Sequence, residues 1–170
     1  MIDDCFINWY EGKGRIEVPP IIGCIISDKD GKNIAVFEIF HNALNHYIVG
    51  NENETEIFKP DLIPMYTSAI ELLTEELFIK DMPSIEIKGS NIKLHIILNF
   101  ETFTIVLFLH PIVDFDKLEV ITKNYLANLF EEFNDQFHEN KEIDSGDFVN
   151  FIERVGWNWL LNLNYEYLSL

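Results

Sequence analysis

Residues 85–110 constrain the fold of this chain more than any other stretch, because they predict three antiparallel strands joined by two tight turns. The first turn, Gly89-Ser90, suits a two-residue hairpin with glycine in the first position. That turn would place Glu86 opposite Lys93, where opposite charges stabilise a cross-strand pair. The stretch therefore predicts a meander within an antiparallel sheet.

The second turn of the meander decides which side chains share a face of the sheet. A turn near residues 100–101 would place Leu98 opposite Phe103, and side chains alternate between the two faces along each strand. One face would then be wholly apolar: Ile85, Ile87, Ile92, Leu94, Ile96, Leu98, Phe103, Ile105, Leu107 and Leu109. The opposite face would be mixed: Glu86, Lys93, His95, Ile97, Thr104, Val106 and Phe108. The last strand, 103–110, is apolar on both faces, which predicts a central, doubly covered position.

A second hairpin is predicted around the Asp-Gly turn at residues 30–31, which separates two apolar runs. The first of these runs, 21–27, is apolar almost throughout and should also be a central strand. The turn would set three cross-strand pairs: Ser27 with Ile34, Ile25 with Val36, and Cys24 with Phe37.

Three helices are predicted from apolar residues at helical spacing, over residues 60–80, 114–139 and 148–163. In the third helix, Gly156 should cost about 1 kcal/mol relative to alanine. The segment 41–59 is expected to be a loop, with an edge strand near 46–49. The first helix should carry one apolar stripe of Leu62, Tyr66, Ala69, Leu73 and Leu77, with Glu71, Glu75 and Glu76 facing solvent. The expected helix caps are Asp61, Asp114 and either Asp144 or Ser145.

The composition predicts a single acidic domain. A chain of 170 residues with 48% hydrophobic residues can bury a sizeable core. A formal charge of −17 predicts repulsion from nucleic acid and anionic membranes, and attraction to a basic partner. No apolar run approaches the roughly 20 residues of a membrane span. No basic leader opens the chain, so we expect a cytoplasmic protein without membrane insertion, with Cys5 and Cys24 reduced.

No residues have the spacing of a catalytic or metal-binding motif. His95 and His110 would lie on the order of 13 Å apart along the sheet, too far to share a metal. The glycines at 12–14 do not form a phosphate-binding loop. A calcium loop starting at Asp28 would need a carboxylate where Ile39 stands. We therefore expect no enzymatic activity, no cofactor and no metal.

The order of predicted elements, β-β-α-β-β-β-α-α, and the opening hairpin IIGCIISDKDGKNIAVFEIF resemble the longin and roadblock families. The resemblance covers about residues 21–140. It implies an α+β fold with a five-stranded antiparallel sheet in the order 2-1-5-4-3, one helix on one face and two on the other. Residues 1–20 would form an N-terminal extension. Residues 141–170 would form a C-terminal helix and aromatic tail that pack on the domain or on a partner.

The resemblance implies a non-catalytic adaptor that binds a small GTPase or a subunit of a trafficking or signalling complex, and that can form homo- or heterodimers. Function is then expected on the helices and at the margins of the sheet, where the strand edges 33–40 and 85–89 are open. The candidate partner-binding residues are Phe37, Ile39, Trp157, Trp159, Tyr165 and Tyr167. Two alternatives are a ligand-binding domain or enzyme that uses the mixed sheet face near Lys93 and His95, and a structural subunit of an obligate oligomer.

Overall fold

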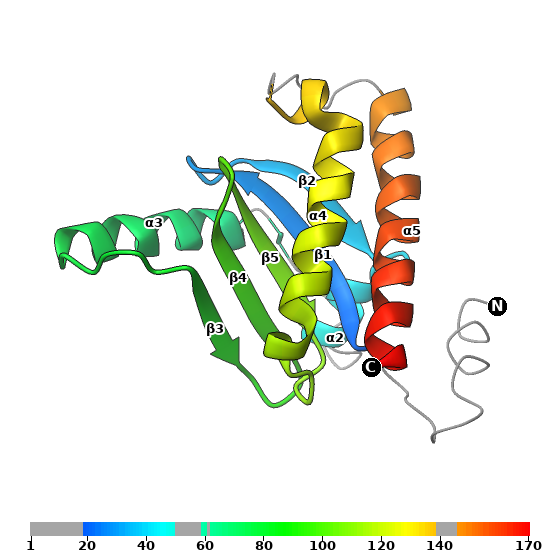
Figure 1. The fold of residues 1–170 in the computed structure, drawn as a ribbon, viewed down its shortest axis with the longest axis horizontal. Coiled ribbons are helices and arrows are strands. Elements are labelled where there is room, and N and C mark those ends of the chain that lie inside the picture. Colours follow the sequence, from blue (N-terminus) through cyan, green and yellow to red (C-terminus); the bar gives the residue numbers. More distant parts are fainter. Residues whose placement is uncertain (1–18, 50–58, 61, 139–145) are drawn as a thin grey trace.

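The computed structural model describes residues 19–49, 59–60, 62–138 and 146–170 (Figure 1). The predictions for residues 1–18 and 50–58 and for the caps Asp61, Asp144 and Ser145 lie outside these residues. The elements are β1 (Ile21–Asp28), β2 (Asn33–Glu38), α2 (Ala43–Ile48), α3 (Leu62–Glu76), β3 (Ser84–Lys88), β4 (Lys93–Phe100), β5 (Phe103–Leu109), α4 (Phe115–His138) and α5 (Gly146–Ser169).

The strands form one five-stranded antiparallel sheet in the order β2-β1-β5-β4-β3. This is the predicted order, and β1 and β5 lie side by side in the middle with almost every residue buried. Helices α4 and α5 cover one face of the sheet, and α2 and α3 lie on the other (Figure 1). The predicted α+β fold is therefore confirmed, with one additional short helix.

That additional helix, α2, replaces the loop and edge strand predicted for this region. Asn42 adopts a left-handed conformation with φ 62°, which turns the chain out of β2. The Glu38 carboxylate then accepts hydrogen bonds from the backbone N–H groups of Asn42 and Leu44, at 3.2 and 3.0 Å. These bonds satisfy backbone amides at the start of the helix, which have no partners within the helix itself. The sequence pattern near residues 46–49, which suggested a strand, did not indicate this capping. The buried Leu44 packs close to Gly23 of β1.

The β1–β2 register is largely as predicted. Cys24 pairs with Phe37 and Ile25 with Val36, but Ser27 pairs with Asn33 rather than Ile34. A bulge next to the tight turn shifts the last pair by one residue.

The meander has the predicted strands with shifted registers. In β3–β4, Glu86 lies opposite His95, a shift of two residues that leaves each side chain on its predicted face. In β4–β5 the turn lies at Glu101-Thr102, with Glu101 at φ 54°, and Ile96 pairs with Val106. This shift of one residue exchanges the faces of β5 relative to β4, so the predicted faces were wrong for that strand. Phe103, Ile105 and Leu107 share the face of His95, not that of Ile96.

Helix α5 packs against β1, β2 and α4, so the aromatic C-terminal segment contacts this chain's own sheet (Figure 1). Trp159 is buried, its ring lies 6.2 Å from that of Phe37, and its indole N–H donates to the Tyr125 carbonyl at 2.9 Å. The buried Asn164 amide accepts from the Ile21 N–H at 2.8 Å and donates to the Ile21 carbonyl at 3.0 Å. These bonds join α5 to the first residue of β1.

Candidate protein-interaction surface

The apolar stripe of α3 faces solvent instead of the sheet. Among the described residues of this helix, only Pro64 and Thr67 are buried. The large apolar side chains of the helix and of the turn after it are exposed by between 44% and 85%. We call them the α3 surface: Leu62, Met65, Tyr66, Leu72, Leu73, Leu77, Phe78 and Ile79. In Figure 1, α3 extends past the edge of the sheet, away from α4 and α5.

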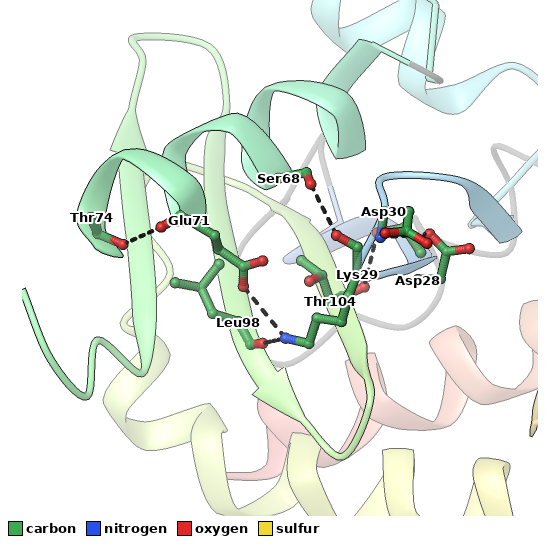
Figure 2. Close-up of polar contacts among 9 residues, drawn as sticks. Asp28, Lys29, Asp30, Ser68, Glu71, Thr74, Leu98 and Thr104 are labelled. Carbon is green, nitrogen blue, oxygen red and sulfur yellow. Dashed lines mark hydrogen bonds and ion pairs between the residues drawn. The ribbon is translucent and has the colours of Figure 1, made fainter. Parts of the chain in front are cut away.

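Polar contacts with the β1–β2 turn hold α3 in this orientation (Figure 2). Lys29 reaches from the turn between the helix and β4, where its ammonium lies 3.4 Å from the Glu71 carboxylate and donates to the Leu98 carbonyl. The Ser68 hydroxyl donates to the Lys29 carbonyl at 2.9 Å. Glu71 was expected to face solvent, but it lies on the sheet side. The polar residues of α3 therefore attach the helix and leave its apolar side outward.

The C-terminus of α3 adds an unusual residue to the α3 surface. The Phe78 N–H bonds to the Glu75 carbonyl at 3.0 Å, and the Ile79 N–H bonds to the Thr74 carbonyl at 2.9 Å. These two bonds form a Schellman motif with Phe78 at the position that glycine usually occupies. Phe78 has φ 56° and its side chain is 85% exposed. A left-handed conformation is strained for phenylalanine, and a side chain that is 85% exposed gains little packing energy to offset the strain.

A hollow of about 380 Å³ lies beside the α3 surface. It is bordered by α3, by the segment between α3 and β3, and by Leu98 of β4. Leu72 and Glu75 line it from the helix, and Ile79, Asp81 and Met82 line it from the connection to β3. At the adjacent edge of the described sheet, β3 carries the exposed Ile87. The α3 surface is thus an apolar area with acidic residues at its margin.

The structure separates the candidate partner-binding residues of the tail and of β2 into two groups. Phe37, Ile39 and Trp159 are buried between the sheet and α5 and expose almost no side-chain surface. Trp157 and Tyr165 are exposed, and Tyr167 is partly buried against the core. Partner binding therefore stays a prediction for these residues, and Trp157, Tyr165 and Tyr167 are the ones with accessible side chains.

The mixed sheet face near Lys93 and His95 lies beneath the start of α4. Both side chains are buried, with 6% and 7% exposure, and the His95 ring stacks on Phe115 at 3.5 Å between ring centroids. Glu86 lies beside them, 3.8 Å from the Lys93 ammonium and 3.5 Å from His95 Nδ1. The Lys93 ammonium also donates to the Val113 carbonyl. The polar groups of Glu86, Lys93 and His95 face one another beneath α4. This arrangement does not favour an open ligand site.

Burial and charge shift the pKa values in this cluster. Desolvation lowers the pKa of His95 below its ordinary value, while contact with Glu86 raises it by a smaller amount. Burial alone would raise the pKa of Glu86, but the contacts with Lys88, Lys93 and His95 together outweigh burial and lower it. At neutral pH the cluster is therefore a neutral imidazole beside an ionised Glu86 carboxylate. Elsewhere in the sheet, burial raises the pKa of the Cys24 thiol, as expected for a core cysteine.

The described part of the chain contains no cluster of three or more histidine, cysteine, aspartate or glutamate residues placed to hold a metal. None of the helices in that part combines the length and apolar character that crossing a bilayer requires.

Two solved structures are similar in fold to this chain. A Roadblock/LC7 domain from Streptomyces avermitilis aligns with a TM-score of 0.43 and 10% sequence identity, over 81% of this chain and 95% of that one. Myxococcus xanthus MglB aligns with a TM-score of 0.43 and 12% identity, over 77% of this chain and 95% of that one. No protein-family model matches the sequence, and no curated protein matches it significantly.

The α3 surface was not among the partner-binding residues chosen from the sequence. Its signal was present as the stripe of Leu62, Tyr66 and Leu73. A helical stripe shows that one side of a helix is apolar, but it does not tell whether that side meets the core or a partner. The opposite side of α3, with Thr67, Ser68 and Glu71, is polar yet meets the sheet.

Proposed function

We propose that this chain is a non-catalytic protein-interaction module that docks a protein partner through the α3 surface. The outward apolar stripe of α3 carries the proposal, because soluble monomers rarely expose contiguous apolar areas beyond a few hundred Å². The strained, exposed Phe78 supports it, since strain of this kind persists where function needs the side chain.

A small GTPase is the partner class that we propose first, in a trafficking or signalling complex of the cytoplasm. The topology, which resembles the longin and roadblock families, supports this choice. The margin of the α3 surface carries Glu75, Glu76 and Asp81, all exposed. A partner with an apolar recess bordered by lysine or arginine would complement both the stripe and the acidic margin.

The α3 surface also fits a dimer, either with a second copy or with a related chain. It lies at the β3 side of the sheet, so two chains could bury their apolar helices together while their β3 edges approach. Light scattering over a range of concentrations tests this part of the proposal. A chain that stays monomeric at every concentration would exclude the homodimer and leave the GTPase partner in place.

Binding to immobilised small GTPases, each loaded with GDP or with a non-hydrolysable GTP analogue, tests the main proposal. We expect at least one GTPase to retain the wild-type chain in one nucleotide state. Leu73→Glu should abolish retention because it places a charge inside the apolar contact. Val120→Glu is the matched control, since Val120 is an exposed apolar residue on α4, with 69% exposure against 56% for Leu73. Failure of every GTPase, or equal loss with both variants, would contradict the proposal.

A further inference from the structure

A second groove lies on the other side of the molecule, between the outer edge of β2 and helix α5. It has a volume of about 280 Å³ and is lined by consecutive residues of β2, Val36 to Glu38, by Phe40 and His41 after the strand, and by Glu153 and Trp157 of α5. Side chains of consecutive strand residues point to opposite faces of a sheet. A groove lined by three consecutive strand residues is therefore in contact with the edge of the strand, where the main chain is accessible.

The main chain of β2 presents hydrogen-bonding groups toward this groove. β2 is an edge strand of the described sheet. The Ile39 N–H points inward, because it donates to the Ile22 carbonyl of β1 at 3.0 Å. The N–H and C=O of one residue point to the same side in an antiparallel strand, and successive residues alternate. Val36 and Glu38 therefore turn their N–H and C=O groups outward, as strand addition requires.

The side chains around the groove favour a cation. Trp157 is 40% exposed, and its indole N–H donates to the Ile39 carbonyl at 2.7 Å, which fixes the ring beside the strand. Glu153 is exposed one helical turn earlier on the same side of α5. The Trp157 ring and the Glu153 carboxylate together attract a lysine or arginine side chain.

We propose that the β2–α5 groove binds an extended, basic segment of a protein partner. The segment adds a strand to the edge of β2 through the main-chain groups of Val36 and Glu38, and it places a lysine or arginine side chain against Trp157 and Glu153. Charge complementarity selects this occupant, because the chain has a formal charge of −17 and Glu153 lines the groove. The site is independent of the α3 surface.

Fluorescence anisotropy with short labelled peptides tests this proposal on the full chain. The probe alternates lysine and valine, a second peptide replaces each lysine with glutamate, and a third keeps the lysines but has N-methylated amides along one edge. We expect only the first peptide to bind well. Methylation should weaken binding by about tenfold or more, because it removes strand pairing without changing charge. Equal binding of the methylated peptide would overturn strand addition.

Variants of the chain separate the groove from general attraction to an acidic protein. Glu153→Lys should weaken the lysine peptide by about tenfold. Glu132→Lys makes the same charge change at an exposed position of α4 and should have a much smaller effect. In NMR spectra, the backbone amides of Val36 and Glu38 should shift on binding while those of α3 should not. Equal effects of the two substitutions, or shifts confined to α3, would overturn the proposal.

Discussion

Phe78 lowers the stability of the fold through its strained backbone, and it adds an exposed ring to the α3 surface. Its left-handed conformation costs roughly 1–2 kcal/mol relative to glycine in the folded chain, whereas glycine loses roughly 0.5–1 kcal/mol more entropy on folding. Phe78→Gly should therefore stabilise the fold by about 0.5–1 kcal/mol, measured by urea unfolding. The same variant should weaken partner binding, because it removes the most exposed ring of the α3 surface.

Leu77→Gly is the control for this prediction. Leu77 is exposed by 60% at the preceding position and is not among the described residues with positive φ. Its replacement removes similar apolar surface without relieving strain, so it should destabilise the fold by about 0.5–1 kcal/mol. If both variants destabilise the chain equally, Phe78 is not strained.

Replacing Gly156 with alanine would have two opposed effects on stability, and the distance to the Phe37 ring decides which effect is larger. Alanine would gain about 1 kcal/mol of helix propensity in α5. A Cβ at this position, however, would lie 2.0 Å from Cδ1 of the Phe37 ring, which is buried and cannot retreat freely. Overpacking of this kind costs typically about 1–3 kcal/mol and can cost more.

We therefore expect Gly156→Ala to lower the free energy of unfolding by about 1–2 kcal/mol, since the clash outweighs the propensity gain. The smaller side chain of Phe37→Leu should make the alanine less harmful in the double variant. Additive effects of the two substitutions would show that the ring is not what excludes the Cβ.

At the scale of elements, Asn164 determines how α5 meets the sheet. Its buried amide satisfies both backbone groups of Ile21, at the start of a central strand. Asn164→Ala should cost about 1–3 kcal/mol, because it leaves buried polar groups without partners. Asn162→Ala, at an exposed position of the same helix, should change stability by less than about 0.5 kcal/mol. Equal costs in urea unfolding would contradict a specific role for the Asn164 bonds.

The elements also show how far the sequence could predict this fold. Apolar runs and turn residues were sufficient for the strand order, because β1 and β5 are apolar on both faces and must be central. The β4–β5 register was not predicted, since moving the turn to Glu101-Thr102 depends on a positive φ at Glu101 that no motif marks. In place of the edge strand expected near residues 46–49 the structure has α2. The Glu38 carboxylate accepts hydrogen bonds from backbone amides at the start of this helix.

The candidate site was less predictable than the fold for a different physical reason. The periodicity of α3 was correct, but the side that meets the sheet depends on Lys29, which comes from a distant turn and binds Glu71 and Leu98. A long-range polar contact of this kind has no local sequence signature. Burial of Phe37 and Trp159 against each other also depended on Gly156, which the sequence alone presents as a helix-weakening residue.

At the scale of the whole molecule, acid pH changes stability in two opposite directions. Protonating carboxylates reduces the self-repulsion that a formal charge of −17 creates, which favours the folded chain. Against this, burial lowers the pKa of His95 in the folded state, so the unfolded chain binds a proton first as the pH falls below about 6.5. The stability that neutral His95 contributes is present above that pH and is lost below it.

High salt should separate the two effects, because it screens repulsion among exposed charges more than it alters the buried cluster. In about 0.5 M salt, where the Debye length is only a few Å, we expect the free energy of unfolding to fall between pH 7 and pH 5. His95→Gln should flatten this slope, since glutamine does not titrate beside Glu86, Lys93 and Glu119, the charged groups that act on His95. If the slope persists in His95→Gln, another group causes the acid sensitivity. His110 is then the first candidate, because burial lowers its pKa as well.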